Sequence, residues 1–242
     1  DYIYANFCAM KQFFLFLFSA VILASCDITR GSGNIITESR SVGGFTGVSV
    51  GGDFDVEVKI GPETKLVVEA DDNIMKYIDT RVSGNMLKIR TEDMHNYRDV
   101  HMKVYITTPS LTKVYASASA RVDVLDLLKS DNRLTFNASS SADVQAEVET
   151  PEVEADASSA GTVKLRGRTR TYKAQASSGA DIRSYDLLSE NTKVSVSSGA
   201  KAQVHASINL DAQASSGGDV GYRGGAAVSK SESSGGSVSK KD

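Results

Sequence analysis

The chain has 242 residues, a formal net charge of −3 and 40% hydrophobic residues, with few aromatic residues (7%) and no Trp. Charges of both signs alternate along the chain and leave no basic field that would attract nucleic acid, so we expect no nucleic-acid partner. Both cysteines, Cys8 and Cys26, lie within the first 26 residues. The rest of the chain therefore has no thiol for a disulfide, a cysteine-bound zinc ion or a nucleophile.

Residues 10–25 have the pattern of a signal peptide, with Lys11 followed by an apolar run from Phe13 to Ala24. This run of roughly 12 residues is too short to span a ~30 Å hydrocarbon layer as a helix. Its end, Leu23-Ala24-Ser25-Cys26, is similar to the lipobox of bacterial lipoproteins, which implies lipidation of Cys26. We therefore expect an exported lipoprotein, anchored in a membrane of the cell envelope with the outer membrane favoured; the alternative is an ordinary signal peptide with an incidental cysteine.

Short segments flank the predicted signal peptide on both sides. Residues 1–9 do not fit a signal peptide, and we predict that they are an upstream extension, with Met10 as the true initiator. Residues 26–34 are predicted to be the anchor linker. Within them Gly31-Ser32-Gly33-Asn34 is not followed by a helix pattern, so a phosphate-binding loop is disfavoured and a flexible link is expected.

Residues 35–110 are predicted to form a β-rich head that caps the remainder of the chain. Hydrophobic and polar residues alternate from Phe54 to Ile60 and from Met102 to Ile106, as in half-buried strands. The stretch 71–78 indicates a turn or one short helix with an Asp or Asn cap, followed by a strand from Met86 to Arg90.

Residues 111–242 contain seven short Ser/Gly-rich segments that align without gaps and recur every 18 to 22 residues. Their first serines are Ser117, Ser139, Ser158, Ser177, Ser197, Ser215 and Ser233. This period is typical of one solenoid coil, and we assign the serines to its corner. In the later segments a glycine stands two residues after the first serine, where a tight bend requires positive φ, and stacked serine hydroxyls are expected to link the corners by hydrogen bonds.

Hydrophobic columns keep register with these corners. Five residues after each first serine stand Val122, Val144, Val163, Ile182, Ala202, Val220 and Val238. Such columns are typical of the inward face of stacked strands, whereas a flexible Ser/Gly linker, the alternative, has no use for them. We therefore predict an all-β fold: a right-handed parallel β-solenoid with a less regular β-rich cap, forming one continuous domain over residues 35–242.

The segments GSGNIITESRSVGGFTGVSVGGDFDVEV and ADDNIMKYIDTRVSGNMLKIRT, together with the SSG-type repeats, resemble the head GIN domain family of auto-transporter adhesins. The resemblance covers about Gly31 to Lys241. It implies a β-solenoid and an exported location in a bacterial envelope. It implies little about activity, and no catalytic residues come with it.

Candidate metal and catalytic residues are few. Asp143, Asp181 and Asp219 share one column, but they stand on alternate coils roughly 10 Å apart, too far to share a calcium ion. The histidines His95, His101 and His205 have no ligand spacing, and no GxSxG elbow is present. We expect no metal site, no cofactor and no catalytic centre.

Three functions remain open from the sequence. The first is a non-enzymatic envelope lipoprotein whose repeated face acts as an adhesin by binding a glycan or an envelope or host protein, because repetition multiplies weak contacts. The second is a polysaccharide-processing β-helix enzyme, by analogy of fold alone. The third is a structural or regulatory periplasmic component.

Overall fold

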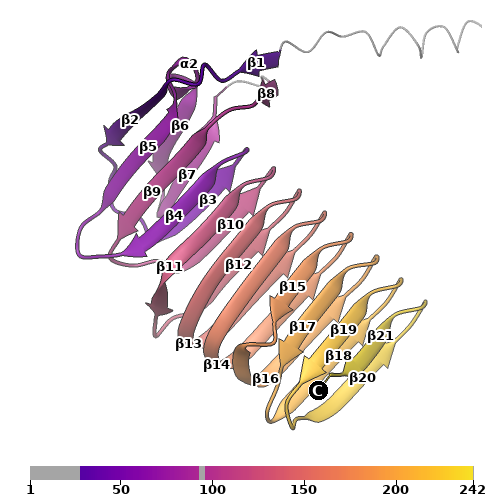
Figure 1. The fold of residues 1–242 in the computed structure, drawn as a ribbon. Coiled ribbons are helices and arrows are strands. Elements are labelled where there is room, and N and C mark those ends of the chain that lie inside the picture. Colours follow the sequence, from indigo (N-terminus) through magenta and orange to yellow (C-terminus); the bar gives the residue numbers. More distant parts are fainter. Residues whose placement is uncertain (1–27, 93–95, 242) are drawn as a thin grey trace, which may run out of the picture.

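The computed structural model describes residues 28–92 and 96–241. The predicted signal peptide, Cys26 and His95 lie outside the described residues. Strands make up almost all of the described secondary structure, with one helix of four residues, α2 (Asp72–Met75). The predicted all-β solenoid is confirmed, and Figure 1 shows its coils stacked from the indigo head to the yellow C-terminal end.

The head contains β1 (Ile28–Arg30), β2 (Ile35–Arg40), β5 (Lys65–Asp71), β6 (Ile78–Ser83), β7 (Met86–Thr91), β8 (Asn96–Arg98) and β9 (Met102–Thr108). The stacked coils contain β3 (Gly47–Gly51), β4 (Asp55–Ile60), β10 (Lys113–Ser117), β11 (Arg121–Lys129), β12 (Leu134–Ala138), β13 (Asp143–Ala157), β14 (Thr162–Ala176), β15 (Asp181–Ser184), β16 (Leu187–Val196), β17 (Lys201–His205), β18 (Asn209–Ala214), β19 (Asp219–Arg223), β20 (Ala227–Glu232) and β21 (Ser237–Lys240).

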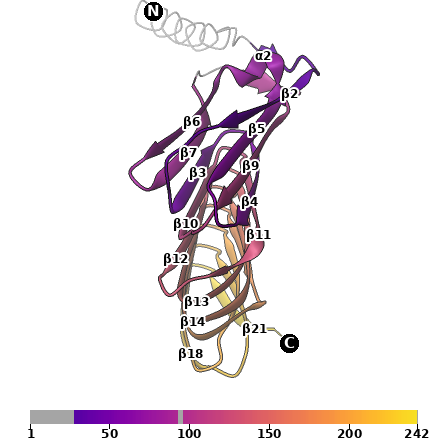
Figure 2. The same ribbon diagram turned by 90° about the vertical axis from the view of Figure 1, so that its left-hand side faces the viewer.

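Each coil contributes one strand to each of two facing layers, which Figure 2 shows in a flattened side view. The layer that runs into the Ser/Gly turn contains β3, β10, β12, the second halves of β13, β14 and β16, then β18 and β20; we call its outer surface the pre-turn face. The layer that leaves the turn contains β4, β11, the first halves of β13 and β14, then β15, β17, β19 and β21; its outer surface is the post-turn face. Pairing between coils is parallel throughout both layers.

The core is the thin space between these layers. The predicted inward column is buried, with exposed fractions of 1% for Val144, 0% for Val163 and 0% for Ile182. These residues lie directly over one another in the parallel register. The hydrophobic period of the sequence therefore matches the real spacing of the coils, and small aliphatic side chains fill a space too narrow for many aromatic rings.

The predicted corners are tight turns. In all seven, the residue three positions after the first serine donates its N–H to the serine carbonyl oxygen, at N···O distances of 2.8 to 3.3 Å. The two residues between have positive φ, for example 53° at Ser178 and 70° at Gly179. These are the dihedral signs of a type I′ turn, so glycine is favoured at the third position, while the serine before it carries an unfavourable left-handed conformation.

Main-chain hydrogen bonds, rather than the expected serine hydroxyls, join successive turns. The Ser177 N–H donates to the Ala157 carbonyl (3.0 Å), and the Gly179 N–H donates to the Ser198 carbonyl (3.1 Å). Of the seven predicted serines, Ser117 alone makes a side-chain hydrogen bond within the described residues, a long one of 3.4 Å to the Val50 carbonyl. The stacked backbones already direct their polar groups along the stack, which leaves the hydroxyls free to face solvent.

The head extends both layers beyond the repeats. β3 and β4 pair in parallel with β10 and β11 and form a coil of their own, so the stacking continues across residues 110 and 111. On the far side β7 pairs with β3 and β9 pairs with β4, and the antiparallel neighbours β6 and β5 follow, with β2 beyond β5. These strands cover the backbone edge of the first coil, which would otherwise be free to pair with another chain.

Two local expectations for the head need correction. The segment from Gly31 to Asn34 is not a flexible link, because the Gly33 N–H donates to Asp71 Oδ1 (2.7 Å) and the Ser32 hydroxyl donates to Asp72 Oδ1 (2.6 Å). The short helix α2 forms where predicted, but Asp71 at its N-cap makes no capping hydrogen bond. The second carboxylate oxygen of Asp71, Oδ2, accepts the His101 N–H instead (2.7 Å). This carboxylate therefore connects β5, which ends at Asp71, with the segments around Gly33 and His101.

None of the helices formed by residues 28–92 and 96–241 has the length and hydrophobicity needed to cross a membrane.

Candidate functional site

Two adjoining hollows run along the pre-turn face beside the turns, and together we call them the polar groove. The first has a volume of about 380 Å³ and the second about 330 Å³, and both are lined by Asp156. They extend across β3, β10, β12, β13, β14 and β16. At about 4.8 Å between neighbouring strands, this is a length of ~24 Å.

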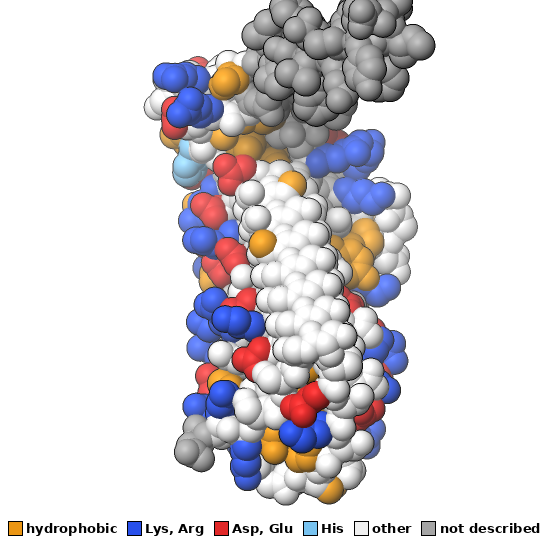
Figure 3. Space-filling model, turned by 90° about the vertical axis from the view of Figure 1, so that its right-hand side faces the viewer, with side chains coloured by type: hydrophobic (Ala, Val, Ile, Leu, Met, Phe, Trp, Pro, Cys, Tyr) orange, Lys and Arg blue, Asp and Glu red, His pale blue; other side chains and the backbone are white. Residues whose placement is uncertain are grey.

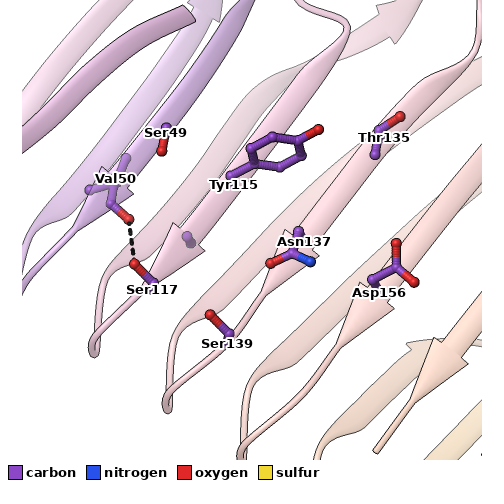
Figure 4. A pocket seen from close by; sticks show the side chains of 9 residues that line it. Ser49, Val50, Tyr115, Ser117, Thr135, Asn137, Ser139 and Asp156 are labelled. Carbon is purple, nitrogen blue, oxygen red and sulfur yellow. Dashed lines mark hydrogen bonds between the residues drawn. The ribbon is translucent and has the colours of Figure 1, made fainter.

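A single column of outward side chains forms most of the groove floor. The column, which we call the polar ladder, is Ser49, Tyr115, Asn137, Asp156, Gln175, Ser195, Gln213 and Ser231, each opposed in register to the next. Figure 4 shows its members Tyr115, Asn137 and Asp156 on neighbouring strands of the groove. Hydroxyl, amide and aromatic groups therefore recur at one strand spacing.

The ladder side chains have unused hydrogen-bonding capacity. None of the eight makes a side-chain hydrogen bond or ion pair with another described residue. Tyr115, Asn137 and Asp156 are half-buried rather than extended into solvent. An amide offers donors and acceptors together, so the groove presents a row of partly desolvated polar groups ready to bind an external partner.

Asp156 is the one formally charged member of the ladder. Partial burial raises the pKa of this carboxyl, and the nearby carboxylate of Glu154 raises it further, while Lys173 acts in the opposite direction. Glu154 itself pairs with Lys173 (2.6 Å) and Arg133 (3.6 Å). The charges beside the groove are therefore largely neutralised within the face, and the groove floor is polar rather than strongly charged.

Five of the seven predicted corner serines border the groove, and the turns of Ser215 and Ser233 lie beyond its end at β16. Figure 3 shows the turns as a continuous strip of uncharged polar side chains and backbone, with charged side chains on both sides. Ser117, Ser139, Ser158, Ser177 and Ser197 also line the two hollows. The sequence located these serines, but it did not single out the ladder residues two positions before them.

The aspartate column predicted not to bind calcium lies on the post-turn face. Asp143, Asp181 and Asp219 are separated in register by Thr162 and Lys201, and Asp181 pairs with Arg183 (2.7 Å). His101 contacts Glu69 (2.7 Å) in the head, and His205 lies in β17. In the part of the chain that the structure describes, no group of three or more His, Cys, Asp and Glu side chains is arranged to hold a metal ion.

Comparison with known proteins identifies the family of the chain and shows solved structures with the same fold. The model of the family described as "Putative auto-transporter adhesin, head GIN domain" matches residues 44–226, which is most of the chain. The chain belongs to this family. The match to the head GIN domain family begins before β3 and ends after β19, so it includes the whole polar groove. Membership in an adhesin-like family indicates an exported envelope protein.

Solved structures share the fold of this head GIN domain protein. A putative adhesin from Bacteroides fragilis aligns with a TM-score of 0.79 and 21% identity, covering 88% of this chain and 98% of that one. A putative lipid binding protein from Parabacteroides distasonis (TM-score 0.73, 18% identity, 89% and 100% covered) and a putative adhesin from Parabacteroides merdae (0.72, 19%, 89% and 100%) are also similar. No curated protein matches the sequence.

Proposed function

We propose that the protein is a non-enzymatic envelope lipoprotein, anchored through Cys26, that binds an extended glycan along the polar groove and acts in adhesion. The observation that carries the proposal is the polar ladder: one unpaired hydrogen-bonding side chain per coil, held in register over the length of the groove. Many weak contacts of this kind add up along a polymer that repeats at a similar distance.

The spacing of the ladder favours a glycan over an extended peptide. Its rungs are about 4.8 Å apart, because they follow the distance between strands. Side chains on one face of an extended peptide recur at roughly 6.6 Å, twice the rise per residue, and therefore lose register with the rungs after a few residues. A pyranose residue has about the length of one rung, so successive sugars can meet equivalent side chains.

The chemistry of the groove also fits sugars. Amide and carboxyl groups such as Asn137, Asp156 and Gln175 can donate to and accept from sugar hydroxyls. The half-buried ring of Tyr115 offers a flat apolar surface to a sugar ring. Both features act on a neutral ligand, in agreement with the single charge on the groove floor.

Binding without cleavage is the function that this groove supports. Hydrolysis of a glycosidic bond ordinarily uses two carboxyl groups on either side of the bond. Among the described residues Asp156 is the one carboxyl that lines the groove, and its neighbour Glu154 is held in ion pairs by Lys173 and Arg133. We expect a glycan that binds to be recovered with no new reducing ends.

A glycan array with the purified protein tests the proposal. The double variant Asn137→Ala/Gln175→Ala removes two rungs and should weaken binding of the best array glycan about 30-fold, from roughly 1 kcal/mol for each lost hydrogen bond. The control Lys201→Ala changes an exposed residue on the post-turn face and should leave affinity unchanged. Binding that is equally strong in the double variant would overturn the glycan groove.

The anchor is tested separately. Cells fed an alkyne fatty acid should label the protein, the Cys26→Ser variant should carry no label, and fractionation should place the labelled protein in the outer membrane. Label retained on the Cys26→Ser variant would contradict lipidation at this residue without affecting the groove.

A further inference from the structure

Another hollow lies on the post-turn face, separate from the two hollows of the polar groove. It has a volume of about 330 Å³. Four cationic side chains and one carboxylate line it: Lys164, Arg166, Arg183, Arg223 and Asp186. We call it the cationic pocket. The whole chain has a net charge of −3, whereas the side chains that line this pocket carry more positive than negative charge.

A break in the regular coil builds one wall of this pocket. Between β15 and β16 the chain leaves the strand pattern, and Tyr185 lies across the post-turn face towards β19. A Cβ at Gly221 would stand 2.3 Å from the Tyr185 hydroxyl oxygen, so this ring position depends on the absence of a side chain at Gly221. The Arg223 guanidinium stacks on the ring, 4.4 Å from its centroid. The wall is therefore preorganised, with Arg223 fixed at the rim.

Two cations of the pocket are direct neighbours across strands. Lys164 in β14 is opposed in register to Arg183 in β15. Like charges in this position are destabilising. The pre-turn face also opposes two lysines, Lys173 and Lys193, but there each pairs with a carboxylate, at 2.6 and 3.2 Å.

The pocket cations keep unused capacity for an anion. Lys164 and Arg223 form no ion pair with a described carboxylate. Arg183 uses its Nε on Asp181 (2.7 Å), which leaves both terminal nitrogens for other partners. Arg166 binds one oxygen of Glu147 through Nε and Nη2 (3.0 and 2.9 Å) and keeps Nη1. Several charge-assisted donors thus converge on one volume without a protein acceptor for each.

We propose that the cationic pocket binds an acidic sugar of a glycan, through a carboxylate or sulfate group held by Lys164, Arg183 and Arg223. Guanidinium groups bind such oxoanions with paired N–H donors, and the bound anion removes the repulsion between Lys164 and Arg183. Within the protein the repulsion is compensated only in part, because Arg183 pairs with Asp181 while Lys164 has no carboxylate partner among the described residues, and an external anion would complete the compensation.

The surroundings favour a glycan over an anionic lipid surface. The aliphatic residues that line the pocket, Ala146 and Leu165, are each 2% exposed and cannot insert into an acyl layer, and the half-buried Tyr185 ring is covered on one face by Arg223. Peripheral membrane binding by a basic site ordinarily combines charge with exposed apolar groups. The pocket therefore has the charge for an acidic headgroup but not the apolar surface that would hold it at a membrane.

The test is a titration of the purified protein with a uronate tetrasaccharide, its neutral counterpart, inorganic sulfate, and phosphatidylglycerol vesicles. We expect the uronate to bind, the neutral sugar to bind at least tenfold more weakly at this site, and sulfate to compete. Lys164→Gln and Arg223→Gln should each weaken uronate binding about tenfold. The matched control is Lys201→Gln, which removes an exposed cation of the same face that lies outside the pocket.

The variant Gly221→Ala adds a positional test with no change in charge. Its methyl group displaces Tyr185 and with it Arg223, so uronate affinity should fall while the thermal unfolding curve shows whether the coil is intact. Equal losses in Lys201→Gln and Lys164→Gln, or binding to vesicles in preference to the uronate, would overturn the proposal. Glycan binding in the groove of the pre-turn face is measured by Asn137→Ala/Gln175→Ala and is independent of either result.

Discussion

Among the residues that the structure describes, Tyr172 is the largest fully buried side chain, and its hydroxyl has one hydrogen-bond partner. The Tyr172 and Ser184 oxygens are 3.0 Å apart, and Ser184 Oγ lies 2.7 Å from the Gln203 carbonyl oxygen. A carbonyl accepts only, so the single serine proton is donated to Gln203. The tyrosine must therefore donate to Ser184, and the Ser184 hydroxyl links β14, β15 and β17.

This geometry predicts an unusual order of stabilities. Ser184→Ala leaves a buried tyrosine hydroxyl without an acceptor and should cost about 1–3 kcal/mol. Tyr172→Phe leaves Ser184 bonded to Gln203 and should cost about 1 kcal/mol. In the double variant the unsatisfied hydroxyl is gone, so Tyr172→Phe/Ser184→Ala should be more stable than Ser184→Ala alone, by about 1 kcal/mol.

Urea unfolding of the four proteins, followed by circular dichroism, measures this cycle. The midpoint should shift at constant m-value, because the change is one of stability and not of the surface exposed on unfolding. If the double variant is less stable than Ser184→Ala, or if the two substitutions are additive, Tyr172 does not depend on Ser184 and the inferred direction of the hydrogen bond is wrong.

Further predictions concern pH and backbone conformation. Burial raises the pKa of Tyr172 above its value in the unfolded chain, so the unfolded state loses this proton first as pH rises. The free energy of unfolding should therefore fall beyond about pH 10, by up to ~1.4 kcal/mol per pH unit. Urea midpoints measured across this range should fall less steeply in Tyr172→Phe. Gly179→Ala, at φ 70° with open space around the new methyl group, should cost about 1 kcal/mol in the same unfolding assay. Gly167→Ala, at φ 114° and with its Cβ 2.1 Å from the Val148 carbonyl oxygen, should cost clearly more; equal losses at the two glycines would show that conformation alone sets the cost.

The coil could be predicted from the sequence because every coil places a small aliphatic residue at the same position of the repeat, and that position is buried in the core. Val144, Val163 and Ile182 share a position in the repeat and share the buried column. The coil of β3 and β4 lacked the Ser/Gly signature and was assigned to the head. Its signal was the alternation Val48, Val50, Val56 around Gly51-Gly52, which has the same register as the later coils.

The candidate sites were harder to predict for two different reasons. The polar ladder has no shared residue type, since Tyr115, Asn137 and Gln175 have in common only their outward direction and their lack of a partner. The cationic pocket depends on contacts between coils that are not neighbours, such as Tyr185 over Gly221. A periodic sequence pattern predicts contacts between adjacent coils, and it does not predict a side chain such as Tyr185 that reaches a coil further along the solenoid.

The two sites show how a solenoid can bind different chemistries with one core. The inward columns must stay aliphatic in every coil, but each outward column is set by a single residue per coil and can change without disturbing the stack. Where the coils remain regular, the outward columns are straight, and the surface they form suits a partner that is itself extended and repetitive. Where the chain departs from the coil, at Tyr185 and Asp186, side chains from several strands converge on one hollow that is open to solvent, and recognition of a single charged group becomes possible. Regular coils therefore supply length, and the break in the strand between β15 and β16 supplies local specificity.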